Sequence, residues 1–364
     1  MSKIRLLVVD DAAFIRLALN KLLSADPELE VVATAANGRI ALDKLQQCQP
    51  DAVILDIEMP EMNGLETLAA LRSTHPKLPV VMFSTLTKSG ARATVDALLL
   101  GANDYATKPG TQADVNHEIR DVLIPKIKLH ALPSVATESV RPAAATPTDS
   151  SARLQQVPPF VKATPTPARH AEVVAIASST GGPNALAQLL ADLPEDLSAA
   201  ILIAQHMPPI FTKQLAFRLS SRGNIIIREG ELDRLVVPGE GWIAPGDFHM
   251  IVEQRRGGVR LRLNQDPPEH SCRPAADVLF ASVAKVYGPA GLGVVLTGMG
   301  KDGHQGCRHI HDAGGQILVQ DRASSVVWGM PGSVAEAGLA DGVFPLDRLG
   351  AEITRRVSMK KPKC

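Results

Sequence analysis

The serine-rich turn at residues 178–182 carries the side chains best suited to nucleophilic chemistry. It reads Ser-Ser-Thr-Gly-Gly, follows the apolar run at 173–177, and precedes a helical pattern that opens on Pro183. Proline suits the first turn of a helix, and the free N–H groups at a helix start favour negative charge. A serine here could attack a carbonyl beside donors for an oxyanion, although the same turn could bind phosphate or be purely structural.

Two further apolar runs end on the other side chains that a serine hydrolase needs. Residues 199–205 lead to His206, and residues 291–296 lead into a glycine-rich turn that contains Asp302. A helical pattern follows each of the three runs, which predicts parallel strands whose carboxyl ends share one edge of a sheet. At that edge Ser179, His206 and Asp302 would be nucleophile, base and orienting carboxylate.

The order of these residues differs from that of the α/β-hydrolases. The serine precedes the histidine and the histidine precedes the aspartate, whereas α/β-hydrolases run serine, acid, histidine and carry a G-x-S-x-G elbow. The sequence therefore predicts triad chemistry on another α/β fold.

The first third of the chain alternates strand and helix patterns and places polar side chains where strands end. Strands are expected at residues 4–9, 29–35, 52–55, 79–83 and 104–107. The side chains at their carboxyl ends are Asp10, Asp11, Asp56, Ser84 and Lys108. Carboxylates gathered in one cleft are tolerated when Mg²⁺ and a lysine neutralise them, and such a cleft can accept a phosphoryl group.

This N-terminal part resembles the receiver domain of bacterial two-component response regulators. The residues that carry the resemblance are Asp10-Asp11, the stretch 55–64 (Leu-Asp-Ile-Glu-Met-Pro-Glu-Met-Asn-Gly), Ser84 and Lys108-Pro109. One departure is Asn63, where the family usually has aspartate, and we expect it outside the cleft.

The resemblance implies a flavodoxin-like doubly wound parallel sheet. It also implies that Asp56 accepts a phosphoryl group from the histidine kinase of a chemotaxis system. The other implied residues are Asp10 and Asp11, which would hold Mg²⁺ with Asp56, and Ser84, Lys108 and Tyr105, which would respond to the phosphoryl group.

The C-terminal part is similar to the catalytic domain of the chemotaxis protein-glutamate methylesterases, the CheB family. The similarity runs through residues 177–182, 205–209, 243–246, 273–280, 296–303 and 325–331. We expect a Rossmann-like α/β domain with a β-hairpin, whose strands lie at 241–252 and 259–263 around the Gly257-Gly258 turn.

This similarity implies hydrolysis of glutamyl γ-methyl esters, and deamidation of glutamines, on the cytoplasmic helices of methyl-accepting chemoreceptors. It assigns the triad roles to Ser179, His206 and Asp302, places Thr180 and Met299 near the oxyanion, and implies no cofactor for the esterase. The family usually has glycine and alanine where this chain has Ala-Ser at 177–178, so only the following Thr-Gly-Gly selects Ser179 as the nucleophile.

Composition divides the chain into two domains and a linker. Prolines recur from residue 125 to 167 among alanine, threonine and serine, and periodicity is lost. We expect a receiver at 1–124, a flexible linker at 125–168 and a catalytic domain at 169–358. The family resemblance implies that the receiver covers the mouth of the esterase site, and the linker would allow phosphorylation to release it.

Charge and cysteine content narrow the classes of function. Lysine plus arginine number 38 and aspartate plus glutamate 38, which argues against nucleic acid as the main partner. The cysteines at 48, 272, 307 and 364 form no C-x-x-C pair, which favours a reduced compartment. No apolar run is long enough to span a bilayer, so we expect a cytoplasmic protein that is not embedded in a membrane.

Four alternatives compete with this interpretation. His304, Cys307 and His311 share a face of a predicted helix and could contact a metal, but a polar helix surface is favoured because no fourth ligand is near. Cysteine hydrolysis through Cys272 or Cys307 is disfavoured because neither follows an apolar strand. A catalytically inactive adaptor that binds receptors or a kinase stays open, whereas a DNA-binding output domain would need a compact basic helix-turn-helix.

Overall fold

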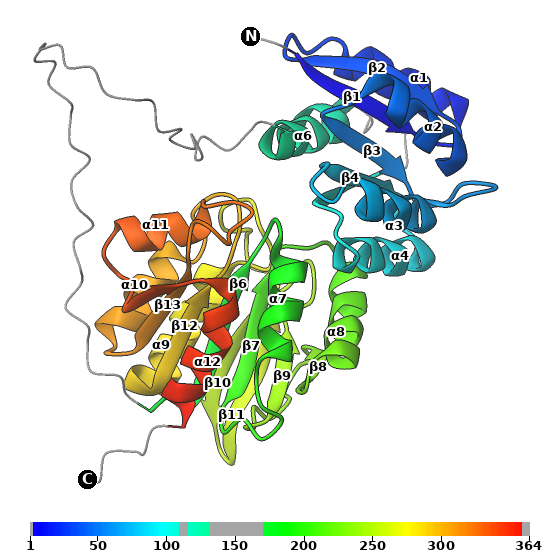
Figure 1. Cartoon of the computed structure of the whole chain (residues 1–364). Helices are drawn as coiled ribbons and strands as arrows, with labels where there is room; N and C mark the ends of the chain where they lie inside the picture. The colour runs from blue at the N-terminus through cyan, green and yellow to red at the C-terminus, as the bar shows by residue number, and fades with distance from the viewer. Residues whose placement is uncertain (1–2, 109–115, 132–169, 359–364) are drawn as a thin grey trace, which may run out of the picture.

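The computed structural model describes residues 3–108, 116–131 and 170–358, which fold into two units, each built on a parallel sheet (Figure 1). The first unit has the strand order β2-β1-β3-β4-β5, the doubly wound order that was predicted. Its strands are β1 (Ile4–Val9), β2 (Leu29–Ala35), β3 (Ala52–Asp56), β4 (Val80–Ser84) and β5 (Asp104–Thr107). Its helices are α1 (Ala13–Leu23), α2 (Gly38–Cys48), α3 (Gly64–Thr74), α4 (Lys88–Leu99), the π-helical η1 (Glu118–Leu123) and α6 (Ile124–Ala131).

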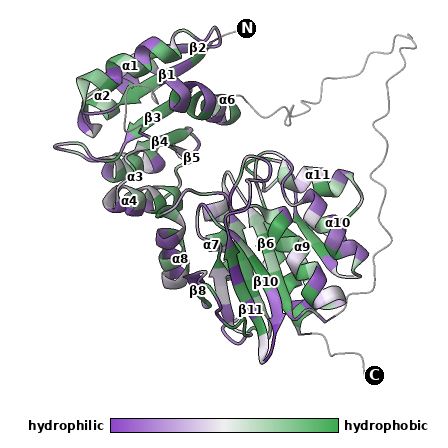
Figure 2. Cartoon of the chain, turned by 180° about the vertical axis from the view of Figure 1, so that it is seen from behind, coloured by the Kyte–Doolittle hydropathy of each residue, from purple (hydrophilic) through white to green (hydrophobic). Residues whose placement is uncertain are grey.

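The sequence explains the inner position of β3 and β4. Both strands are buried along their whole length, and their apolar runs suit strands covered by helices on both faces. Figure 2 shows the hydrophobic strands inside and the mixed helices outside. Asn63, the departure from the receiver pattern, caps α3 through a capping box with Glu66, so it has a structural task outside the cleft.

The second unit is a seven-stranded sheet with the order β14-β13-β12-β6-β7-β9-β8. Its strands are β6 (Val173–Ser178), β7 (Ala200–Gln205), β8 (Ile226–Glu229), β9 (Glu240–Ile243), β12 (Gly291–Val295), β13 (Gln316–Gln320) and β14 (Gly342–Phe344). Its helices are α7 (Gly182–Ala191), α8 (Phe211–Arg222), α9 (Ala276–Tyr287), the short η2 (Gly288–Ala290), α10 (His304–Asp312), α11 (Met330–Glu336) and α12 (Leu346–Val357).

The order of these strands determines where the site lies. β6 pairs in parallel with β7 on one side and with β12 on the other. The next strand in the sequence, β7, lies on one side of β6, and the later strand β12 lies on its other side. The strand order therefore reverses at β6, and binding sites form beyond the carboxyl ends of the strands at such a topological switch point. The three strands predicted to carry the triad are therefore adjacent in the sheet.

Two expectations about element bounds are corrected. The hairpin consists of β10 (His249–Arg255) and β11 (Gly258–Asn264), whereas residues 241–243, expected in its first strand, belong to β9 of the main sheet. The linker was expected from residue 125, but α6 continues to Ala131. Pro125 directly follows the junction between the π-helical η1 and α6, and the helical stretch runs through it without a break. The rest of the expected linker, to residue 168, lies outside the described residues.

The two units are in contact. Helix α4 of the first unit lies against α8 of the second, and one buried apolar cluster includes residues of both (Figure 1). In the described part of the chain, we find no helix that combines the length and the apolar character needed to cross a bilayer.

Candidate active site and receiver cleft

The two adjacent serines at the end of β6 have different surroundings. Ser178 is fully buried, and its hydroxyl donates a hydrogen bond of 2.7 Å to Oε1 of Gln205. Gln205 in turn donates from Nε2 to the carbonyl of Ser179. The Ser178 hydroxyl is thus bound inside the fold, which favours Ser179 as the nucleophile.

Glycines hold the neighbouring loops close to Ser179. A Cβ at Gly298 would lie 2.9 Å from Cβ of Ser179 and 2.3 Å from Sδ of Met330. Gly181 has a φ of +77°, and a Cβ there would lie 2.7 Å from Val326. Larger residues at these two positions would push the loops off the nucleophile.

His206 and Asp302, predicted to act together, are in contact in the structure. Nε2 of His206 lies 2.7 Å from Oδ2 of Asp302. The Asp302 carboxylate is buried and accepts backbone hydrogen bonds from Ala276 and Asp277 at the start of α9, and from Gly303. Burial alone would raise the pKa of Asp302, but these hydrogen bonds and His206 hold it below its usual value. The acid is therefore fixed and ionised.

The second ring nitrogen of His206 contacts Cys272. Sγ of Cys272 lies 3.5 Å from Nδ1. Burial lowers the pKa of His206, but hydrogen bonds to Asp302 and then to Cys272 outweigh it and raise the pKa to about 9. Within the described residues Ser179 makes no side-chain hydrogen bond, so the predicted nucleophile and the predicted base share an edge of the sheet without being joined.

Cys272 is the residue of this site that sequence reasoning missed. It was set aside because it follows no apolar strand, and it reaches His206 from a loop ahead of α9 instead. The only signal in the sequence was its place directly before the Arg-Pro motif at 273–274.

Thr180 and Met299, expected near the oxyanion, lie in the turns beside Ser179. Neither backbone N–H donates to an acceptor within the described ranges, so both stay available to a ligand. The Met299 side chain is exposed. Their contribution to an oxyanion site stays a prediction.

The receiver cleft brings the predicted acidic residues together. Asp10, Asp11 and Asp56 each offer an oxygen within 4.8 Å of the others. Nζ of Lys108 lies 2.7 Å from both Asp10 and Asp56. Burial raises the pKa of Asp56 to about 6, against the opposing effect of Lys108. Carboxylate oxygens in this arrangement fit a hard cation such as Mg²⁺.

Of the predicted response residues, Tyr105 contacts the second domain, whereas Ser84 and Lys108 have their partners within the receiver. The Ser84 carbonyl accepts a hydrogen bond from the backbone N–H of Lys108, and the Ser84 hydroxyl faces the start of α4. Tyr105 stacks on Phe211, the first residue of α8, with ring centroids 5.0 Å apart. Phe211 follows His206 by one short loop, and Tyr105 and His206 line the same cavity, so the stack lies close to His206.

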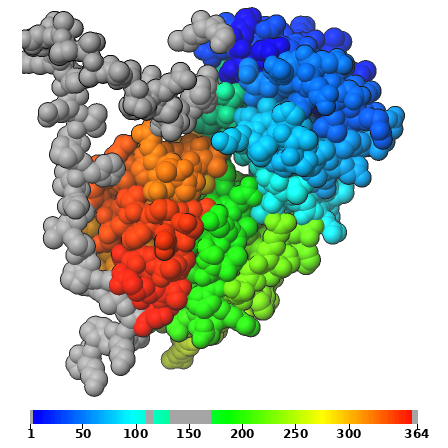
Figure 3. Space-filling view, in the orientation of Figure 1, coloured from blue at the N-terminus to red at the C-terminus, as the bar shows by residue number. Residues whose placement is uncertain are grey.

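Polar contacts and a shared cavity complete the interface. Arg218 on α8 forms an ion pair with Asp96 on α4, and Arg222 donates to the carbonyl of Leu99. Figure 3 shows the receiver lying against the catalytic domain on this side.

A cavity of about 440 Å³ lies between the domains. It is lined by Tyr105, Ala106, Thr107, Glu118, Val122 and Lys126 of the receiver and by His206, Met207, Pro208, Ser271, Cys272 and Arg273 of the catalytic domain.

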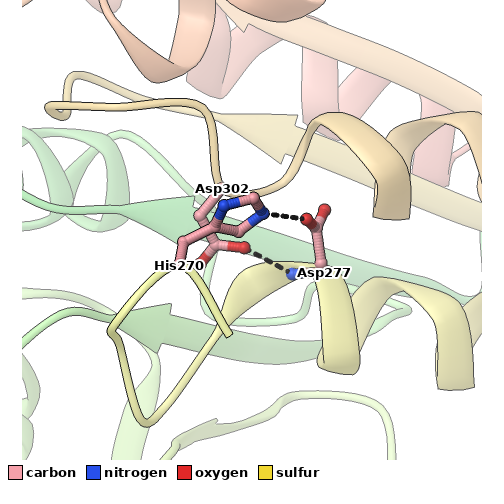
Figure 4. A group of neighbouring side chains, drawn as sticks. All are labelled: His270, Asp277 and Asp302. Atoms are coloured by element: carbon pink, nitrogen blue, oxygen red, sulfur yellow. Dashed lines mark hydrogen bonds and ion pairs between the residues drawn. The ribbon is translucent and has the colours of Figure 1, made fainter. Parts of the chain in front are cut away.

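The alternative metal group on α10 does not form. Cys307 is buried in the core, His311 is exposed, and His304 binds the carbonyl of Ser333. In the parts of the chain that the structure describes, the gathered metal-type ligands of the catalytic domain are His270, Asp277 and Asp302 instead (Figure 4). Hydrogen bonds within the protein already engage these side chains.

Comparison with known proteins agrees with this geometry. The family model described as CheB methylesterase matches residues 174–353, and the response regulator receiver domain model matches residues 6–120. A protein-glutamate methylesterase/protein-glutamine glutaminase from Trichodesmium erythraeum is 50% identical over 98% of this chain and 100% of its own length. One of the same name from Nocardioides is 49% identical over 100% of this chain and 98% of its own.

A solved structure supports the fold of the second domain. The catalytic domain of the Thermotoga maritima CheB methylesterase superposes with a TM-score of 0.50 at 39% identity, covering 51% of this chain and 98% of that one. The residues that the CheB methylesterase family model matches, 174–353, include the carboxyl ends of β6, β7 and β12. The chain belongs to the CheB methylesterase family, with a response regulator receiver domain ahead of its methylesterase domain.

Proposed function

We propose that this protein hydrolyses glutamyl γ-methyl esters, and deamidates glutamines, on the cytoplasmic helices of methyl-accepting chemoreceptors. The observation that carries the proposal is the His206–Asp302 pair beside a serine whose neighbour, Ser178, is bound inside the fold. The names of the relatives supply the substrate class.

The chemistry follows from the placement of the side chains. Oγ of Ser179 attacks the ester carbonyl, and His206 takes its proton and passes it to the departing methanol. The N–H groups of Thr180 and Met299 stabilise the oxyanion. Water then cleaves the acyl-enzyme to release glutamate, with His206 again as base. A glutamine side chain follows the same course with ammonia as the leaving group.

The receiver would control access to this site. Asp10, Asp11 and Asp56 would hold Mg²⁺, which supplies charge neutralisation for phosphoryl transfer from the chemotaxis kinase to Asp56. Lys108 holds Asp56 in place, and Tyr105 links the cleft to α8 through its stack on Phe211. The cavity between the domains includes His206, which supports a resting state with restricted access.

Peptide mass spectrometry of a methylated receptor tests the proposed reaction. Glutamyl methyl esters and glutamines on the receptor helices should both become glutamate when the protein and a phosphodonor are present. A receptor that is bound but chemically unchanged would favour the adaptor alternative.

The pH dependence follows from the raised pKa of His206. Imidazolium cannot accept the proton of Ser179, so only the neutral ring is active. With the pKa raised to about 9, we predict that kcat/KM of the unphosphorylated protein rises about tenfold per pH unit up to that region. A pH–rate profile that is flat between about pH 5 and 8, where histidine ordinarily titrates, would remove His206 from the role of base.

A further inference from the structure

Both ring nitrogens of His206 are engaged in the structure, and neither contacts the proposed nucleophile. Nε2 is joined to Asp302 at 2.7 Å, and Nδ1 lies 3.5 Å from Sγ of Cys272. A neutral imidazole has one acceptor nitrogen. Because Nε2 donates to the carboxylate, Nδ1 is the only atom that can take a proton from Ser179, and the sulfur occupies its side of the ring.

The loop that carries Cys272 holds the thiol in a defined place. His270 and Ser271 have φ angles of +51° and +62°, a region that residues other than glycine rarely adopt. Backbone hydrogen bonds of 3.1 and 2.8 Å between Glu269 and Cys272 close the turn. Strain of this kind persists where the surroundings impose it, and it clusters at functional sites.

Contacts on both sides of this loop impose that conformation. Nε2 of His270 lies 2.9 Å from Asp277, whose backbone N–H also binds Asp302 (Figure 4). On the other side, Nε of Arg273 donates to Asp247 at 3.0 Å. The start of α9 therefore fixes the orienting acid and the cysteine loop together.

The cysteine also faces the receiver. Cys272 and His206 line the cavity whose opposite wall is formed by Tyr105, Glu118 and Lys126. The space available to the loop thus depends on how the receiver is docked.

We propose that Cys272 is a positioning residue that competes with Ser179 for Nδ1 of His206, and that the nucleophile is activated only when this contact opens. The inference rests on the proposed roles of Ser179 and His206. A neutral ring accepts the S–H of Cys272, and a protonated ring donates N–H to the sulfur, so the contact blocks the base in either state.

The sulfur contact also affects the protonation of the base. The groups that face His206 are Asp302 and Cys272 in direct contact, with Tyr105, Glu118, Lys126 and Arg273 around the cavity. After Asp302, Cys272 is the next cause that keeps the pKa of His206 high. Removing the sulfur should therefore shift the activity profile toward lower pH.

The test is steady-state kinetics of the unphosphorylated full-length chain with Cys272→Ala and Cys272→Ser. For Cys272→Ala we expect kcat to rise about 2- to 10-fold, the range for one hydrogen bond of ordinary strength, with little change in KM. The midpoint of its pH–rate profile should also move to lower pH. Serine restores a hydroxyl at the same place, so Cys272→Ser should stay near wild type.

A matched control is Cys48→Ala, at the end of α2 in the receiver, which should leave rate and profile unchanged. An unchanged or reduced kcat for Cys272→Ala, or a rise without any shift in pH midpoint, overturns the inference. Ser179→Ala, measured alongside, separates the two proposals. If that variant keeps its activity, the proposed site is wrong; if it is inactive while Cys272→Ala behaves as wild type, only the role of Cys272 fails.

Discussion

Replacing Ser179 with alanine is expected to lower the rate of ester hydrolysis by a factor on the order of 10⁴ or more, because residues of a triad act as a unit and the loss of one removes most of their joint effect. Ser179 lies at the end of β6, next to β7 and β12, whose carboxyl ends lead to His206 and Asp302. Receptor binding should be retained, since the change removes one oxygen from the surface.

Ser178→Ala is the matched control for this experiment. Its hydroxyl donates to Gln205 in the interior and does not face substrate. The change should leave most of the catalytic rate but destabilise the fold by about 1–3 kcal/mol, because Oε1 of Gln205 loses its partner. Thermal unfolding and hydrolysis rates of both variants check this. An equal loss of rate in the two variants would show that the nucleophile is assigned to the wrong serine.

Release of the receiver is expected to activate the esterase by about 5- to 150-fold, the usual range of coupling between two sites. A fragment that begins near His170 should hydrolyse receptor esters faster than the resting full-length chain. The physical reason is that the receiver shares a cavity with His206 and is held there by the Tyr105–Phe211 stack and the Asp96–Arg218 ion pair. A related catalytic domain is known as a separate crystal structure, which makes the fragment practicable.

Phosphodonor with Mg²⁺ should produce the same activation in the full-length chain. Phosphorylation adds roughly one to two negative charges at the cleft and must favour the released arrangement over the docked one. Asp56→Asn should abolish the response to phosphodonor. If the fragment is no faster than the resting protein, the receiver is not an inhibitory lid, and recruitment or allosteric activation takes its place.

Arg218→Ala gives a graded check on the same interface. The Asp96–Arg218 pair is partly exposed, so its loss should weaken docking by about 0.2–1 kcal/mol and raise the resting rate at most about fivefold. The fully phosphorylated rate should be unchanged, because the pair is already broken in the released state. A lower phosphorylated rate would place Arg218 in catalysis or substrate binding instead of docking.

The fold and most of the candidate site could be predicted from the sequence, because buried strands are recognisable and most of the site residues follow the carboxyl ends of such strands. Buried parallel strands have apolar sequences, and sites form at their carboxyl edge, so the location of Asp56, His206 and Asp302 could be predicted from their position after such strands. The same rule failed for Cys272, because a loop outside the sheet brings it to His206, and loop conformation depends on tertiary contacts such as the His270–Asp277 bond.

The local hydrophobic pattern of the sequence was also too weak to show where one strand ends and the next begins. Residues 241–252 read as one strand, but β9 joins the parallel sheet and β10 the hairpin, with Pro245 between them. The choice between Ser178 and Ser179 rested on the following Thr-Gly-Gly, and the structure adds the physical reason, which is the hydrogen bond from Ser178 to Gln205. The stacking of Tyr105 on Phe211 has no counterpart in local sequence, since it joins two domains.

The most direct test is release of labelled methanol from membranes that contain chemoreceptors methylated with a labelled methyl group. The full-length protein, Mg²⁺ and a small-molecule phosphodonor are added, and volatile label is followed over time. We predict rapid release that depends on Ser179 and is several-fold slower without phosphodonor. Label that stays on the receptors while the protein binds them would contradict the proposed esterase and leave an adaptor in its place.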